Sequence, residues 1–141
     1  CAPPICPEYM LEFAHGYTYS AHPIACAAGN AVLELLQQEQ APERVQALAP
    51  VLERAVHGLR NAPHVLDIRN FGLAAGLSIA PWPGEPARRP YEVAMKCWEK
   101  GFYVRYGGDT LQLAPPFIST EAEIESLVSA LGDALVETAR S

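Results

Sequence analysis

Apolar residues recur at intervals of three and four positions in several stretches of the chain, and this spacing predicts four helices. The predicted helices cover residues 23–40, 42–60, 90–100 and 120–139. Pro50 lies inside the second stretch and predicts either a kink in that helix or its division into two pieces. Thr120 and Glu123 have the spacing of a capping box, which predicts where the last helix begins.

Shorter apolar stretches between the helices predict strands. These stretches cover residues 65–71, 73–80, 102–106 and 110–114. Gly107, Gly108 and Asp109 separate the last two strands and suit a hairpin turn. Residues 81–89, which include Arg88 and Arg89, are rich in proline and predict a solvated loop.

The order of these elements, in which helices alternate with pairs of strands, indicates an α+β fold. The expected sheet is mostly antiparallel, because hairpin-like strand pairs follow one another, and the helices gather on one side of it. The periodicity also predicts the core. The expected core residues are Ile24, Val32, Leu52, Ile68, Leu77, Trp98, Val104, Leu113, Ile124 and Leu131.

The composition is that of a folded globular chain, because 50% of the 141 residues are apolar and 18% are charged. The net charge of −6 argues against general nucleic-acid binding, since the phosphate backbone would be repelled. No apolar run approaches the roughly 20 residues of a membrane span, and no signal-peptide pattern is visible. The cysteines form no CxxC pair, and Cys26 and Cys97 are expected to be buried free thiols. These features favour a cytoplasmic protein.

The sequence HGYTYSAHP at residues 15–23 predicts a small polar turn that leads into the first helix. Pro23 suits the first turn of a helix, and Ser20 or His22 is expected to cap it. The free N–H groups at such a helix start favour an anion such as a phosphate, and Thr18 adds a hydroxyl donor. The residues alone leave two interpretations open, an ordinary helix cap and an anion site.

Arg105 lies at the end of a predicted strand beside the glycine-rich hairpin. A guanidinium in that place either grips a carboxylate through two parallel hydrogen bonds or remains an ordinary surface group. His22 and Cys26 are four residues apart, so a helix would bring them to one face. No further ligand with metal spacing accompanies them, and no metal site is predicted.

Three blocks of the sequence, FAHGYTYSAHPIACAAG, VLDIRNFGLAAGLSIAP and GFYVRYGGDTLQLAPPF, resemble the class III pyridoxal-phosphate aminotransferases, and within them the ω-amino acid:pyruvate group. The resemblance begins near Glu8 and covers most of the chain. It implies the small C-terminal domain of a fold-type-I pyridoxal-phosphate-dependent transferase. Residues 1–22 are then a phosphate-contacting loop and residues 23–141 the C-terminal domain. The large cofactor-binding domain is expected to lie outside this chain, which resembles a C-terminal fragment.

The resemblance also implies roles for particular residues. Tyr17 and Thr18, with the backbone of Gly16, match the residues that bind the phosphate of the pyridoxal 5'-phosphate held by the other subunit of a dimer. Arg105 matches the arginine that holds the carboxylate of the amino-acid or oxo-acid substrate. The implied partners are a small-molecule amino donor, a 2-oxo acid such as pyruvate, and further copies of the chain in a dimer or tetramer.

Pyridoxal chemistry needs a lysine that forms a Schiff base with the cofactor. Lys96 and Lys100 are the only lysines in the sequence, and both lie on the predicted third helix. The resemblance places the family's lysine upstream of His15, so this chain is expected to contribute no catalytic residue and to be inactive alone. A non-catalytic α+β module for dimerisation or small-carboxylate binding is the alternative that the sequence leaves open.

Overall fold

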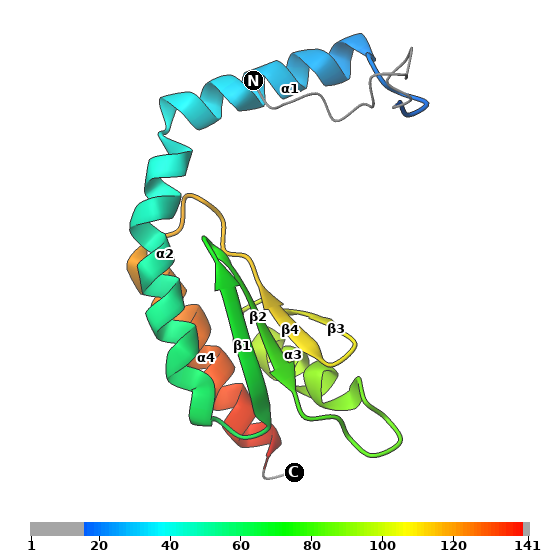
Figure 1. The fold of residues 1–141 in the computed structure, drawn as a ribbon, viewed down its shortest axis with the longest axis vertical. Coiled ribbons are helices and arrows are strands. Elements are labelled where there is room, and N and C mark those ends of the chain that lie inside the picture. Colours follow the sequence, from blue (N-terminus) through cyan, green and yellow to red (C-terminus); the bar gives the residue numbers. More distant parts are fainter. Residues whose placement is uncertain (1–15, 140–141) are drawn as a thin grey trace, which may run out of the picture. The chain divides into compact units, whose positions relative to one another are not determined.

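The structure is a computed structural model, and it describes residues 16–139. The chain divides into a first unit that ends at Gln38 and a second unit that begins at Glu39. The first unit contains a turn followed by helix α1 (Pro23–Gln38), with Pro23 at its first position (Figure 1). The prediction of a helix in this stretch is confirmed.

Helix α1 differs from the expectation in its burial, because none of its residues is buried. The side chains of Ile24 and Val32 are 76% and 53% exposed, so their predicted places in the core are wrong. Cys26 is also exposed, and the prediction that it is a buried thiol is wrong. Helical periodicity shows that a helix has an apolar face, but it does not show which surface covers that face.

The second unit contains a four-stranded sheet in the order β1-β2-β4-β3. Its strands are β1 (Val65–Phe71), β2 (Ala74–Ile79), β3 (Arg105–Gly107) and β4 (Thr110–Leu113). Every neighbouring pair is antiparallel, which confirms the predicted sheet. In this order β3 is an edge strand, with only β4 beside it.

The register of the strands assigns their residues to two faces, since cross-strand partners point to the same side of a sheet. Ala75 pairs with Leu113 and Leu77 pairs with Leu111, and all of these side chains are buried. The alternate positions form the opposite face, here called the open face, where the residues are exposed or half-buried. The open face consists of Asp67, Arg69, Phe71, Ala74, Gly76, Ser78, Arg105, Gly107, Thr110 and Gln112.

Three helices of the second unit cover the buried face of the sheet (Figure 1). They are α2 (Ala41–His57), α3 (Arg88–Glu99) and α4 (Glu121–Thr138), and the short helix η1 (Gly58–Asn61) follows α2. Helix α4 packs against both α2 and α3, while α2 contacts β1 and β2 and α3 contacts β3 and β4. None of the helices in residues 16–139 has the length and apolar character needed to cross a membrane.

The core between these helices and the sheet agrees with most of the predicted positions. The predicted residues that are buried are Leu52, Leu77, Val104, Leu113, Ile124 and Leu131. Ile68 is half-buried, and Trp98 is 63% exposed, so the prediction for Trp98 is wrong. Helix α3 buries Cys97, and the next residue is turned by about 100° around the helix axis, which directs Trp98 outward.

Two local predictions about α2 and α3 also need correction. Helix α2 continues through Pro50, so the predicted division of this helix does not occur; Val51 and Leu52 beside it are buried in the core. Arg88 and Arg89 lie in the first turn of α3 and not in a loop. Their guanidinium carbons lie 4.5 and 4.9 Å from the centre of the Trp82 ring. Pro90 is the third residue of α3, where the missing N–H costs no hydrogen bond of the helix, so the helix can begin before it.

The predicted turn and cap signals are confirmed. Gly107 pairs with Thr110, which leaves Gly108 and Asp109 as a two-residue hairpin turn, and Gly108 has a positive φ of 59°. At the start of α4 the Glu123 N–H donates to the Thr120 hydroxyl at 3.2 Å, and the Thr120 N–H donates to the Glu123 carboxylate at 2.8 Å. The hydrogen bonds that the Thr120 N–H and the Thr120 hydroxyl donate to the Glu123 carboxylate lower the pKa of Glu123.

Candidate functional site

The turn before α1 is closed by its own hydrogen bonds. The Ser20 N–H donates to the Tyr17 carbonyl at 2.9 Å, and the Tyr17 N–H donates to the Ser20 hydroxyl at 2.7 Å. Ser20 therefore stabilises the turn. His15, the first residue of the predicted motif, lies outside the described residues.

Within this turn Thr18 is the side chain best suited to an external anion. Thr18 is exposed, and its hydroxyl makes no hydrogen bond within residues 16–139. Gly16 and Tyr17 are exposed as well, and the Tyr17 side chain is 78% exposed. A hydroxyl donor without a partner in a tight turn at a helix start fits the chemistry of a phosphate group. These residues therefore fit the phosphate of pyridoxal phosphate.

Arg105 is the first residue of the edge strand β3 and lies on the open face of the sheet. It is exposed, and its guanidinium makes no ion pair or hydrogen bond within the described part of the chain. The next residue, Tyr106, lies on the other face, where its ring meets that of Tyr91 edge to face at 5.5 Å. This contact holds β3 against α3 and leaves Arg105 available to a ligand.

The hairpin register places Gln112 directly opposite Arg105. The sequence analysis did not name Gln112. Counting outward from the two-residue turn Gly108–Asp109 would have found it, because Gly107 pairs with Thr110 and Arg105 with Gln112. Thr18 belongs to the first unit and Arg105 to the second, and each is described here within its own unit.

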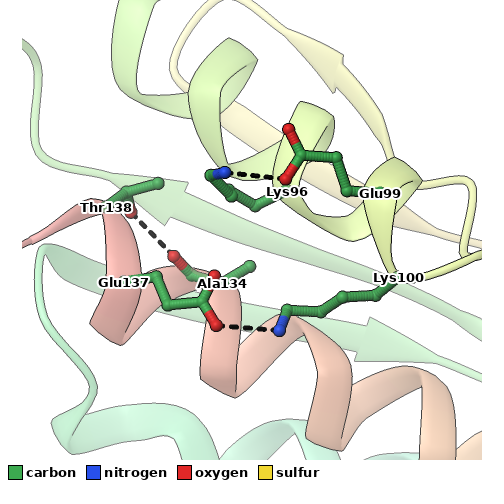
Figure 2. A network of polar contacts seen from close by, with 6 residues as sticks. All are labelled: Lys96, Glu99, Lys100, Ala134, Glu137 and Thr138. Carbon is green, nitrogen blue, oxygen red and sulfur yellow. Dashed lines mark hydrogen bonds and ion pairs between the residues drawn. The ribbon is translucent and has the colours of Figure 1, made fainter.

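Both lysines of the chain are engaged in ion pairs at the end of α3 (Figure 2). Lys96 Nζ lies 2.7 Å from Glu99 Oε2, and Lys100 Nζ lies 2.8 Å from Glu137 Oε1 on α4. The hydrogen bonds to these carboxylates raise the pKa of both lysines above the ordinary value. Each lysine is therefore ion-paired with a glutamate at the end of α3.

The two cysteines of the described residues differ strongly in their surroundings. Cys26 is exposed on α1, whereas Cys97 is fully buried on α3. Burial raises the pKa of the Cys97 thiol to about 11, so the reactive thiolate is scarce at neutral pH. No group of three or more His, Cys, Asp or Glu residues within 16–139 is arranged to hold a metal ion.

We expect iodoacetamide at pH 8 to label Cys26 in the folded chain and to leave Cys97 unlabelled. The reason is that alkylation requires an accessible thiolate, which Cys97 lacks. Peptide mapping by mass spectrometry measures the labelling of each cysteine. The control is the same reaction in guanidinium chloride, in which Cys97 becomes labelled. Equal labelling of the two thiols in the folded chain would contradict the burial of Cys97.

Comparison with known proteins gives consistent matches. The family model Aminotransferase class-III matches residues 5–135. The chain is 52% identical over 129 residues to a beta-alanine–pyruvate aminotransferase of Pseudomonas aeruginosa and 54% identical over 129 residues to an omega-amino acid–pyruvate aminotransferase of Pseudomonas putida. Each match covers 92% of this chain and 29% of the relative. The PMP-bound form of an aminotransferase from Vibrio fluvialis matches with a TM-score of 0.79 at 28% identity, over 92% of this chain and 30% of that one.

The chain belongs to the class III aminotransferase family. This finding confirms the resemblance on which the sequence analysis rests, and the structural match confirms the α+β small-domain fold. Class III aminotransferases depend on pyridoxal phosphate. The chain spans 29% of the length of the two curated relatives, so the activity of a whole enzyme is a separate question.

Proposed function

We propose that this chain supplies the small C-terminal domain of a pyridoxal-phosphate-dependent ω-amino acid:pyruvate transaminase, which moves an amino group from an ω-amino acid or an amine to pyruvate. The observation that supports this most is the identity of 52% and 54% with two relatives named for this reaction. The exposed, unpartnered Arg105 agrees with it, because a substrate carboxylate needs such a cation.

Thr18 donates its hydroxyl to the phosphate of the cofactor, and the backbone of Gly16 and Tyr17 borders the same group. The phosphate belongs to the cofactor of the partner subunit, so the enzyme acts as a homodimer or a larger assembly. Bound pyridoxal phosphate supplies the electron sink for amino transfer. The part of this chain in that chemistry is to hold the cofactor in place through the Thr18 hydroxyl and the backbone of Gly16 and Tyr17.

Arg105 binds the carboxylate of β-alanine in one half of the reaction and that of pyruvate in the other. Two parallel N–H···O bonds from the guanidinium fix the orientation of the carboxylate and hence of the amino group of β-alanine or the oxo group of pyruvate. Because Arg105 is exposed and without a partner in the described residues, nothing there has to be broken when a carboxylate arrives.

We expect the 141-residue chain alone to form no stable lysine adduct with pyridoxal phosphate and to transfer no amino group from β-alanine to pyruvate. The reason is that the resemblance places the family's Schiff-base lysine upstream of His15, whereas Lys96 and Lys100 lie at the end of α3 in ion pairs with Glu99 and Glu137. Borohydride reduction followed by mass spectrometry of the lysine peptides measures the adduct. Glu99→Gln is the matched control, because it removes the ion pair of Lys96 and should still give no turnover. Turnover by the purified chain would overturn this prediction.

A chimeric enzyme tests the proposed function. In it, this chain replaces the matching 129 residues of the Pseudomonas aeruginosa relative. We expect the chimeric enzyme to bind pyridoxal phosphate and to transfer an amino group from β-alanine to pyruvate, as measured by alanine formation. A folded, cofactor-loaded chimeric enzyme without turnover would favour the alternative of a non-catalytic module.

In the chimeric enzyme, Thr18→Ala should weaken cofactor retention roughly tenfold or more, because a hydrogen bond to a charged phosphate is lost. Dialysis followed by the absorbance of the remaining cofactor measures the retention. Ser126→Ala is the control, since within residues 16–139 the Ser126 hydroxyl donates to the Ala122 carbonyl of its own helix and to no other group. In mixed dimers the defect should appear in the site of the unmutated subunit. A defect confined to the mutated subunit's own site would contradict the role across the interface.

A further inference from the structure

Four residues form a continuous row across the open face of the sheet. Arg69 of β1 pairs with Gly76 of β2, Gly76 pairs with Gln112 of β4, and Gln112 pairs with Arg105 of β3. Since cross-strand partners share a face, their side chains all project from the same side. The row therefore places Gln112 between two arginines, with a glycine beside it.

The side chain of Gln112 has room to reach a ligand at Arg105. Gln112 is exposed, and its amide makes no hydrogen bond within residues 16–139. Gln112 Nε2 lies 3.6 Å from the position that a Cβ atom would take on Gly107, so the amide lies over β3, the strand of Arg105. Gly76 on the other side likewise has no side chain. A depression of about 400 Å³ is lined in part by Arg69, Gly76 and Gln112, and Arg105 is not among its lining residues.

The two arginines of the row are not equivalent. Arg69 Nη1 lies 2.9 Å from Asp67 Oδ2 and donates to the Ser78 hydroxyl at 3.2 Å, so its charge is already compensated. Arg105 has no such partner among the described residues. An anion on the open face is therefore expected at the Arg105 end of the row, where Gln112 is the adjacent side chain with free N–H donors.

We propose that Gln112 is a second substrate-binding residue, whose amide N–H donates to the carboxylate held by Arg105. This inference rests on the proposed function, because it takes the ligand of Arg105 to be a substrate carboxylate. A carboxylate accepts about four hydrogen bonds, and a bidentate arginine uses two of them. The amide of Gln112 supplies a further donor from the neighbouring strand.

The chemistry of an amide also suits a site that takes both acids and amines. A second cation beside Arg105 would repel the positive charge of an amine substrate, whereas an amide is neutral. The Gln112 amide also carries an oxygen acceptor, which a guanidinium lacks. Gln112 therefore contributes to the binding of substrates with a carboxylate and leaves simple amines largely unaffected.

Kinetics of the chimeric enzyme test this proposal. Gln112→Leu should raise the KM for β-alanine and for pyruvate roughly three- to tenfold, and the KM for propylamine should stay near that of the unchanged chimeric enzyme. Adding Gln112→Leu to Arg105→Ala should cause little further loss, because both side chains act on one carboxylate. Arg69→Ala is the matched control on the same face and should change none of these values.

A measurement on the 141-residue chain supports the kinetics independently of turnover. In NMR spectra, added propionate should shift the Gln112 side-chain amide signals together with the Arg105 Nε–H signal.

If Arg105→Ala discriminates acids from amines and Gln112→Leu does not, the role of Gln112 is wrong and the proposed function stands. If Arg105→Ala itself fails to discriminate, the carboxylate site is wrong and both proposals fall.

Discussion

Arg105→Ala in the chimeric enzyme is expected to weaken the use of β-alanine and pyruvate roughly ten- to hundredfold, while propylamine loses little. The physical reason is the loss of a charge-assisted, bidentate contact that only a carboxylate makes. The ratio of kcat/KM for β-alanine to that for propylamine measures the effect and cancels any general loss of active enzyme. A smaller decrease in this ratio is expected for Arg105→Lys, which keeps the positive charge and loses the planar guanidinium that makes two parallel hydrogen bonds.

Arg69→Ala is the control for Arg105→Ala, because Arg69 lies on the same open face and is compensated by Asp67. It should leave the kcat/KM ratio unchanged. If the two arginine variants had equal effects, the general positive charge of this face would explain the result. An equal loss toward acids and amines in Arg105→Ala would contradict the role of a carboxylate-binding residue.

Leu131→Ala should lower the free energy of unfolding of the second unit by about 2–5 kcal/mol. Leu131 is 0% exposed on α4, in the cluster that joins α4 to α2, α3 and the sheet. Removing its side chain loses apolar burial and leaves a cavity that the packed helices close only in part. Urea or guanidinium unfolding followed by circular dichroism measures the change.

Leu33→Ala is the matched control for Leu131→Ala, because it makes the same substitution in a helix where the side chain is 62% exposed. Its effect should stay within about 0.5 kcal/mol. If Leu131→Ala is too unstable to purify, Leu131→Met keeps the volume and should cost less than about 1.5 kcal/mol. Equal effects of the two alanine variants would show that the described core is wrong.

Local features of the sequence were sufficient for most elements of the second unit. The hairpin at Gly108 and Asp109 follows from turn chemistry, since only a few residues adopt the backbone that a two-residue turn needs. The start of α4 follows from the Thr120–Glu123 capping box. The buried positions of Leu77 and Leu113 follow from strand alternation, because one face of the sheet is covered by helices.

The burial of helix faces and the contacts between distant residues depend on the tertiary structure, and local sequence patterns do not predict them. Periodicity marked α1 as amphipathic, yet none of its residues is buried in the described structure, because burial depends on a second surface. Helix α3 begins at Arg88, before the predicted start at Pro90, and Arg88 and Arg89 contact the ring of Trp82 in the preceding loop. The same reason applies to Gln112: its sequence neighbours say nothing of Arg105, and only the pairing of β3 with β4 brings the two side chains to one face.

By itself the sequence thus determined the helices, the hairpin, the α+β fold and the resemblance to the family. Which helix faces are covered, which charges are compensated and which side chain stands beside Arg105 depend on contacts between distant residues, and these exist only in the folded chain.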